Sequence, residues 1–257
     1  MKWNKKALVV IFMGLLSLSL FGFGNFGAYC QQDYENNWVS TDTHTWHRCS
    51  YFNTEMKKSM TQAYYYNMVK AARFFETPLS SQSSCGVDTV DLLWADTHGG
   101  TWPNPIRSVL AMWDNWLVAS THNMRLGVSR LSIFATYACE VLKNNDGNFG
   151  ARLRLTWRGG LRIWVGSHNY LYGGSKTQYV GEDFARFMRA GSTVKMAWRD
   201  ALARASAKND AAVAATGRNA DECHYRKDTM KLNNYSTYIR LVDNSISYFC
   251  WTTWDKL

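Results

Sequence analysis

The chain has 257 residues, of which 46% are hydrophobic and 19% are charged, and its formal net charge is +9. This composition excludes a disordered chain and suits one large domain or two small ones. The basic residues form no block, so no nucleic-acid partner is expected, and an anionic cell envelope remains a partner to consider. Aromatic residues make up 15% of the chain, which favours work outside the cytosol.

The N-terminus has the three parts of a secretory signal peptide. Three lysines are followed by an uncharged, mostly apolar run over residues 7–23 and then by small residues. We expect a leader over residues 1–28, cleaved at Gly22–Gly24 or near Ala28, and a single domain over residues 29–257. The alternative is an uncleaved anchor helix, since the run is near the lower length limit for spanning a membrane. A cleaved chain would be secreted, periplasmic or in the cell envelope, without membrane contact of its own.

Six cysteines follow the apolar run, and in an exported chain their default state is a disulfide. Nearness in the sequence suggests the pairs Cys30–Cys49 and Cys223–Cys250, although the sequence alone does not determine connectivity. If Cys139 is a free nucleophile, five cysteines remain, which gives two bridges and one spare thiol.

The first half of the chain predicts helix and strand in turn. Residues 29–50 show no clear period and predict an irregular N-terminal segment. Apolar residues at spacings of three and four predict a helix over residues 54–76. The short apolar run Val90–Ala95 predicts a strand buried on both faces. Residues 108–123 predict a helix or a turn-rich crossover, and Leu126–Tyr137 predicts the next strand.

The second half continues this alternation. A third core strand is predicted over residues 161–166, and apolar stripes predict helices over residues 181–190 and 193–215, the second capped by Ser192 or Thr193. Aromatic and β-branched runs at residues 238–242 and 246–251 predict a strand-rich C-terminal extension. Strands alternating with helices predict an α/β fold with a mostly parallel central sheet and helices on both faces.

Two of the predicted strands end at residues that can carry chemistry. The first runs into Asp96-Thr97-His98-Gly99-Gly100, and the second runs into Ala138-Cys139. Because the carboxyl ends of parallel strands meet at one edge of a sheet, where α/β folds bind ligands, we expect His98 and Cys139 side by side. A thiol beside an imidazole is a nucleophile beside its base.

These motifs, His-Gly after one apolar strand and Ala-Cys after a later one, resemble the caspase-like (caspase–haemoglobinase, clan CD) cysteine peptidases, which include legumain, clostripain, gingipain and metacaspase. The strand at residues 160–166 and the helix pair at residues 184–198 resemble the strand and helices that come after the nucleophile in that group. In particular, residues 87–205 look like uncharacterised, often exported bacterial domains of the DUF6345 type. The Gln-Ala-Cys-x-Gly of true caspases and the Asp-x-Cys of metacaspases are absent, so no member's specificity carries over.

The resemblance implies a three-layer caspase-like sandwich and acyl transfer. Cys139 would attack a scissile carbonyl as the thiolate, and His98 would protonate the leaving amine. The backbone amides of Gly99 and Cys139 would bind the oxyanion. Asp96, on the same side of the pleat, is the candidate to orient His98, and His168 is the candidate to line the pocket. No histidine–cysteine set has zinc-finger spacing, so no metal and no other cofactor is expected.

The sequence therefore predicts an exported cysteine endopeptidase with a Cys–His dyad, or a transpeptidase that uses the same acyl-enzyme, acting on a peptide or protein substrate. One alternative is a non-catalytic module that holds a peptide or glycan on a Trp/Tyr-rich rim, and another is a disulfide-stabilised structural protein of the cell envelope. In those cases Cys139 would be an inert buried thiol, Asp96 a hydrogen-bonding loop residue and His168 a solvated histidine.

Overall fold

A seven-stranded β-sheet forms the centre of the computed structural model, in the order β10-β9-β8-β7-β3-β1-β2. The described residues are 24–35, 42–74, 86–103, 106–114, 117–119, 124–144, 150, 153–154, 156–158, 160–241 and 246–254. The strands of this sheet are β1 (Asn25–Cys30), β2 (Thr61–Tyr66), β3 (Leu92–Asp96), β7 (Ile133–Tyr137), β8 (Ile163–Ser167), β9 (Ala211–Gly217) and β10 (Tyr248–Thr253).

The sheet is mostly parallel, as predicted. The pairs β1–β2, β1–β3, β3–β7 and β7–β8 are parallel, whereas β9 runs antiparallel to its two neighbours. Every residue of β3, β7 and β8 is buried. Uninterrupted apolar runs are typical of strands that are covered on both faces, which is why these three strands could be predicted from the sequence.

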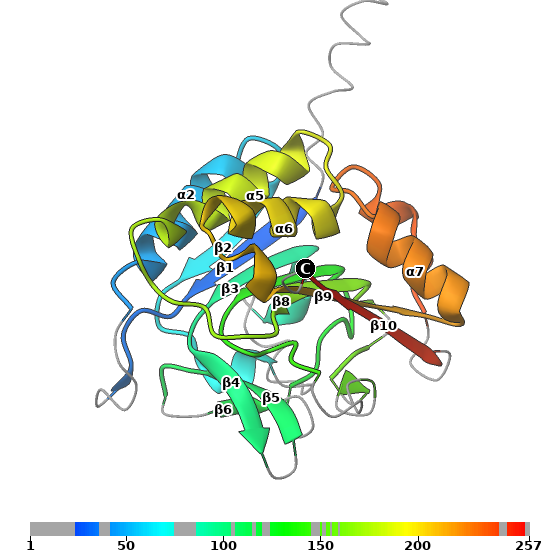
Figure 1. Ribbon diagram of the computed structural model, residues 1–257, viewed down its shortest axis with the longest axis horizontal. Coiled ribbons are helices and arrows are strands. Elements are labelled where there is room, and N and C mark those ends of the chain that lie inside the picture. The colour runs from blue at the N-terminus through cyan, green and yellow to red at the C-terminus, as the bar shows by residue number, and fades with distance from the viewer. Residues whose placement is uncertain are drawn as a thin grey trace, which may run out of the picture.

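One face of the sheet is covered by α2 (Thr45–Met56), α5 (Val180–Arg189) and α6 (Val194–Arg204), while α7 (Ala220–Thr229) packs on β9 and β10 (Figure 1). Large aromatic rings fill the space beneath these helices. The Trp94 ring lies 4.8 Å from that of Phe52 and 6.1 Å from that of Trp198, measured between centroids. Each such fully buried side chain contributes about 2 to 3 kcal/mol of transfer free energy.

The contact between α2 and α5 depends on Gly181. A Cβ atom at this position would lie 2.2 Å from the backbone oxygen of Arg48. Only glycine therefore allows the two helices to approach so closely. The contact holds α2 against the sheet, and α2 carries Arg48 to the carboxyl end of β3.

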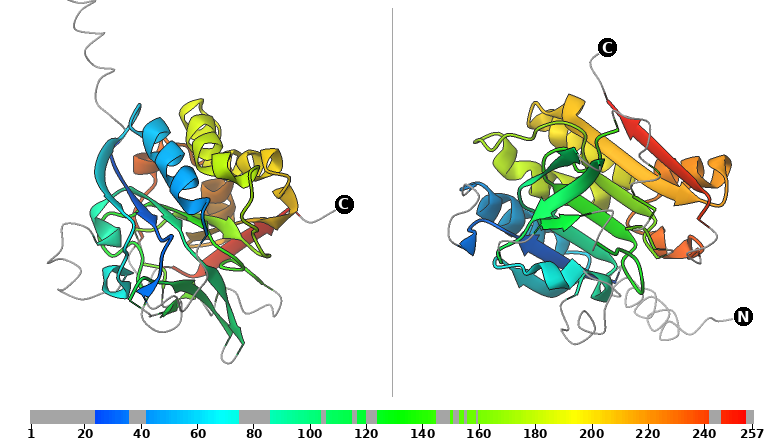
Figure 2. Two further views of the ribbon diagram at one scale, coloured as in Figure 1. Left: turned by 90° about the vertical axis from the view of Figure 1, so that its left-hand side faces the viewer. Right: turned by 90° about the horizontal axis from the view of Figure 1, so that it is seen from below.

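The opposite face is covered by the 3₁₀ helices η3 (Ala71–Phe74) and η4 (Val87–Thr89) and by loops, with the antiparallel sheet β4–β5–β6 on the same side (Figure 2). The bounds are β4 (Gly99–Pro103), β5 (Ile106–Ala111) and β6 (Leu117–Ala119). This arrangement confirms an α/β fold with helical elements around a central sheet. No helix in the described ranges is long and apolar enough to cross a bilayer.

The N-terminal part of the chain differs from its prediction. Among the described residues of 29–50, the first two end β1 and residues 45–50 begin α2, while the described residues between them belong to no strand or α-helix; the helix predicted over residues 54–76 ends at Met56. The inner face of α2 buries the charged residues Arg48 and Glu55, which pair with Asp96 and Arg189. Because charged residues occupy buried positions of α2, its sequence does not show the continuous apolar period that indicates a helix. The aromatic residues that follow form β2, in keeping with their strand propensity.

Three later predictions are corrected in part. The described residues of 108–123 contribute to β5 and β6, and none of them is helical. The helix predicted over residues 193–215 ends at Arg204, and its alanine-rich end is β9, which is buried throughout because tertiary packing overrides the helix propensity of alanine. At the C-terminus β10 confirms the strand predicted over residues 246–251, whereas Tyr238–Leu241 is irregular. Thr193 caps α6 by accepting a hydrogen bond from the Met196 amide, as predicted.

The leader predicted over residues 1–28 overlaps the described part of the chain. Residues 1–23 lie outside the described ranges, but Asn25–Ala28 belongs to β1, where Phe26 and Ala28 are fully buried. A cut near Ala28 would remove most of a strand that pairs on both sides. The central sheet therefore includes Asn25–Ala28, which the predicted leader over residues 1–28 had assigned to the removed segment, and the leader itself stays a prediction.

Candidate active site

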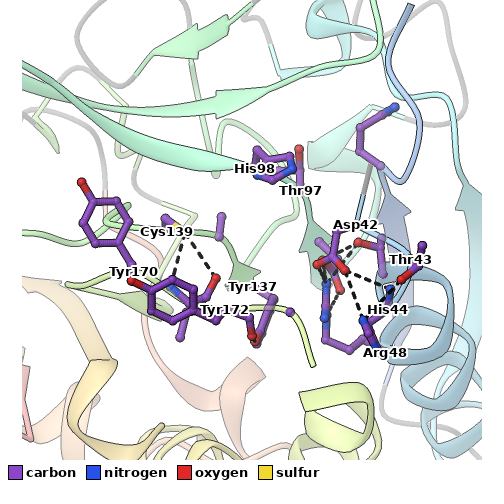
Figure 3. Close-up of a pocket in the computed structure, with 16 residues that line it drawn as sticks. Asp42, Thr43, His44, Arg48, Thr97, His98, Tyr137, Cys139, Tyr170 and Tyr172 are labelled. Atoms are coloured by element: carbon purple, nitrogen blue, oxygen red, sulfur yellow. Dashed lines mark hydrogen bonds and ion pairs between the residues drawn. The ribbon is translucent and has the colours of Figure 1, made fainter. Parts of the chain in front are cut away.

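A pocket of about 490 Å³ lies at the carboxyl ends of the parallel strands (Figure 3). The loops after four strands line it, through Gln31 after β1, His98 after β3, Cys139 after β7 and Leu171 after β8. The pocket lies at a topological switch point of the sheet. In chain order, β2 is placed on one side of β1, whereas β3 and then β7 are placed on its other side. Ligands of open α/β sheets bind at such switch points.

The structure brings His98 and Cys139 to this one pocket, as the sequence predicted. Asp96 and Tyr137 are partners in the β3–β7 register, and the Thr97 amide donates a hydrogen bond to the Tyr137 carbonyl over 3.3 Å. Two residues further along each chain segment, His98 and Cys139 line the pocket. Their catalytic roles remain a prediction.

Cys139 is a free, half-buried cysteine, whereas the pairs Cys30–Cys49 and Cys223–Cys250 form the two predicted disulfides. Its Sγ accepts a hydrogen bond from the Leu171 amide at 3.3 Å and lies 3.5 Å from the Leu171 carbonyl oxygen. Burial raises the pKa of the Cys139 thiol, the Leu171 amide opposes this, and carboxylates, among them those of Glu140 and Asp42, raise it further. The resting sulfur is thus a thiol rather than a thiolate at neutral pH. Cys85, the spare thiol of the prediction, lies outside the described residues.

The turn after Cys139 is strained. Glu140 has a φ of 52°, a left-handed conformation that residues other than glycine adopt at a cost of about 1 kcal/mol. Its amide donates to the Asn169 carbonyl and its carboxylate pairs with Lys143, which hold the conformation. Strain of this kind is concentrated at functional sites. Glutamate has no preference for this conformation, so the sequence carried no signal of it.

Gly99 lies directly against the backbone of Cys139. A Cβ atom on Gly99 would lie 2.8 Å from the Cys139 carbonyl oxygen. The Ala111 amide donates to the His98 carbonyl, so the pair Gly99–Leu110 is the next, non-hydrogen-bonded pair of the antiparallel ladder. The Gly99 amide therefore points away from β5, which leaves it outside the ladder, as a donor to an oxyanion must be.

Tyr34 holds the backbone of His98 and was not predicted. The His98 amide donates to the Tyr34 hydroxyl over 3.0 Å, and that hydroxyl is also 3.0 Å from the Thr97 hydroxyl. The Tyr34 and His98 ring centroids are 5.7 Å apart. Burial raises the pKa of Tyr34 to about 12, so it stays a neutral phenol. It lies in the segment that was predicted to be irregular, where nothing distinguishes it from other aromatic residues.

Asp96 does not take the orienting role suggested for it. Its carboxylate receives Arg48 Nε at 2.6 Å and Nη2 at 2.9 Å, and the Thr45 hydroxyl at 3.3 Å. Strand alternation turns this side chain toward α2, and the buried guanidinium takes both of its oxygens.

His168 does not line the pocket either. Its Nε2 lies 2.6 Å from the Asn209 carbonyl oxygen, and its ring packs edge-on against Trp251. It follows β8, two strands away from β3, and faces the β9–β10 side of the sheet.

Arg48 and Asp42 complete the pocket, and neither could be identified from the sequence. The Arg48 guanidinium lies 4.1 Å from the centre of the Tyr137 ring and 2.6 Å from Asp42 Oδ2. Burial opposes the charge of Asp42, but Arg48 lowers the pKa of Asp42 overall. Within the described ranges no group of three histidine, cysteine or acidic residues is placed to hold a metal ion.

Fold and site together define an α/β protein with a free thiol and an imidazole in one pocket. The family described as a domain of unknown function (DUF6345) matches residues 32–250, and the chain belongs to it. Similar solved structures include caspase-1 from Spodoptera frugiperda, at 11% identity and a TM-score of 0.45 over 90% of this chain and 86% of that one. The Drosophila initiator caspase Dronc has 11% identity and a TM-score of 0.41 over 71% and 70%. Neither likeness says what this chain acts on, and no curated protein matches it.

Proposed function

We propose that this chain is an exported cysteine peptidase in which Cys139 is the nucleophile and His98 the general base and acid. One observation carries the proposal. A free thiol and an imidazole follow two neighbouring parallel strands and line the same pocket. Nucleophile and base in one water-accessible cavity are the minimum that thiol-dependent acyl transfer requires.

The raised pKa of Cys139 determines the order of proton movements. Because the resting sulfur is protonated, His98 removes its proton as Sγ attacks the scissile carbonyl. The amides of Gly99 and Cys139 stabilise the oxyanion that forms. His98 then gives the proton to the leaving amine, which leaves a thioester on Cys139. Water, deprotonated by His98, hydrolyses the thioester, releases the acid and restores the thiol.

Export is part of the proposal and is supported by two features. The N-terminal sequence has the organisation of a signal peptide, and the structure holds two disulfides. Structural disulfides persist in oxidising compartments such as the periplasm or the exterior. A peptide or protein outside the cytosol is therefore the proposed substrate.

Cleavage of a diverse peptide mixture, followed by mass spectrometry, tests the proposal. The wild-type chain should produce new termini, and Cys139→Ala should produce none while keeping both disulfides and an unchanged circular dichroism spectrum. Thr216→Ala, which removes a buried hydroxyl on β9 outside the pocket lining, is the matched control and should still cleave. Cleavage that persists in Cys139→Ala would contradict the proposal, as would a folded wild-type chain that cleaves nothing.

A non-catalytic binding module is the second candidate, and the pocket rim favours it. Tyr170 and Tyr172 are 57% and 78% exposed, which is high for large aromatic side chains beside a cavity. Exposed aromatic faces hold peptides and glycans by stacking. Peptide binding without cleavage, unchanged by Cys139→Ala, would support this candidate.

A further inference from the structure

The charged groups around the pocket do not balance. In its described lining, two carboxylates, those of Asp42 and Asp96, face one guanidinium, that of Arg48. The side chains of Arg48 and Asp96 are 0% and 1% exposed, whereas Asp42 keeps 23% exposure. Apart from the imidazoles of His98 and of His44, whose Nδ1 lies 3.7 Å from Asp42 Oδ1, the charged side chains of the lining therefore sum to a negative charge, although the chain as a whole is basic.

Asp42 is held in a fixed position. Its Oδ1 accepts a hydrogen bond from the His44 amide at 2.9 Å, and its Oδ2 accepts one from Arg48 Nη2 at 2.6 Å. Gly173, after β8, passes so close that a Cβ atom there would lie 2.9 Å from Asp42 Oδ1. In Figure 3 Asp42 and Cys139 lie on opposite sides of the pocket, with Tyr137 below the space between them.

Arg48 cannot serve as the recognition group for an anion in this state. Its Nε and Nη2 are taken by the two carboxylates. Its Nη1 has no hydrogen-bond partner among the described residues but is enclosed away from solvent, against the Tyr137 ring. An acidic side chain in the pocket would have to displace Asp42 and would meet the negative charge of Asp96 behind it.

We propose that the pocket receives a cationic side chain of the substrate, lysine or arginine, and that Asp42 is the residue that determines this specificity. The inference rests on the proposed function, since it names the class of peptide presented to Cys139. A carboxylate that already has one cationic partner still has free lone pairs for a second donor. The exposed rings of Tyr170 and Tyr172 supply aromatic faces on which a guanidinium or the stem of a lysine packs.

The test uses peptidyl acyloxymethyl ketones that differ only in the last side chain: lysine, arginine, uncharged norleucine and glutamate. The second-order rate constant for modification of Cys139 is measured by mass spectrometry on the full folded chain. We expect the lysine or arginine probe to react at least about tenfold faster than the norleucine probe, equivalent to one charge-assisted contact of about 1.4 kcal/mol. Asp42→Asn should abolish that ratio; the ratio is the quantity compared, because loss of the Asp42 charge also acts on the pKa of Cys139 and so on the rate of every probe alike.

Asp210→Asn is the matched control, because Asp210 also raises the pKa of Cys139 but does not line the pocket. Asp210→Asn should keep the preference for the lysine or arginine probe. That result would separate direct contact with the cationic side chain from a general electrostatic effect of nearby carboxylates. Equal rates for lysine and norleucine, faster reaction of the glutamate probe, or a preference that survives in Asp42→Asn would each overturn the inference.

Binding of the corresponding peptide amides to Cys139→Ala, by isothermal titration calorimetry, separates the two failures. If Cys139 is inert to every probe while lysine peptides still bind about tenfold tighter than norleucine peptides, the proposed peptidase fails and cation recognition stands. If the probes label Cys139 without regard to charge, the peptidase stands and the specificity fails. If lysine and norleucine peptides bind equally and Cys139 is inert to every probe, both the peptidase function and the cation specificity are overturned.

Discussion

Asp96 on β3 lies directly beside Tyr137 on β7 in the parallel register of the central sheet. Two residues beyond this pair, the two segments deliver His98 and Cys139 to the same pocket. The two segments leave neighbouring strands that are buried throughout, so the backbone of the central sheet positions both residues.

The protonation state of Cys139 gives the first prediction. Because burial raises the pKa of the thiol above its ordinary value of 9.0, the thiolate fraction at neutral pH is smaller than that of a free cysteine. Alkylation by iodoacetamide should therefore be slow at pH 7 and rise about tenfold for each pH unit, with a midpoint above that ordinary value. Rates for the Cys139 peptide, followed by mass spectrometry against pH, check this. A midpoint near neutrality would show a resting thiolate instead.

The ion pair between Arg48 and Asp96 gives the second prediction. Arg48→Met should lower the free energy of unfolding by about 3 to 5 kcal/mol, because it leaves the Asp96 carboxylate buried without its partner. Urea unfolding measures the loss. Asp96→Asn in the same chain should recover part of it by removing the stranded charge. A loss that is no smaller in the double variant would mean that packing of the arginine stem, not the charge, is responsible.

Two of the pocket residues could be predicted from the sequence and two could not. His98 and Cys139 could be predicted because each follows an apolar strand, and the parallel order of those strands brings their ends together. Arg48 and Asp42 could not, because they lie on and before a helix whose inner face buries charges. A period-based search finds apolar stripes, and the stripe of α2 is short, with Arg48 and Glu55 buried among its apolar residues. Which of several carboxylates meets Arg48 depends on tertiary packing.

The same contrast holds for the fold. The strands β3, β7 and β8 are buried throughout and mostly apolar, and their C-terminal ends were predicted within two residues. The alanines of β9 have a strong helix propensity, and only their burial between neighbouring strands makes them a strand. The left-handed conformation of Glu140 and the position of the Gly99 amide outside the ladder are backbone features, which no side-chain pattern reveals.

The disulfides give the third prediction. Cys30–Cys49 and Cys223–Cys250 close loops with sequence separations of 19 and 27 residues. Replacing either pair by alanines should lower the free energy of unfolding by about 3 kcal/mol, chiefly through the greater entropy of the unfolded chain. Urea unfolding of each double variant, with and without a reducing agent, measures the effect. Equal stability of the wild-type chain in both conditions would contradict it.

The start of the domain gives the fourth prediction. A chain that begins at Gly24 retains all of β1 and should unfold cooperatively, whereas a chain that begins at Tyr29 lacks Phe26 and Ala28 and should not fold. Losing the buried ring of Phe26 alone costs about 3 to 5 kcal/mol, before any loss of strand pairing. Thermal unfolding of the two chains compares them. A cooperative transition for the shorter chain would place the domain boundary at residue 29 after all.

Whether His98 acts on Cys139 is measured most directly by comparing two electrophiles on the same sulfur. In His98→Ala the reaction of Cys139 with a peptidyl acyloxymethyl ketone should fall by about 10² to 10⁴, because the proton transfer that accompanies attack is lost. Alkylation by iodoacetamide at high pH, where the thiol ionises without a base, should change by less than about threefold. Equal changes in the two rate constants, or no change in either, would contradict a Cys139–His98 catalytic dyad.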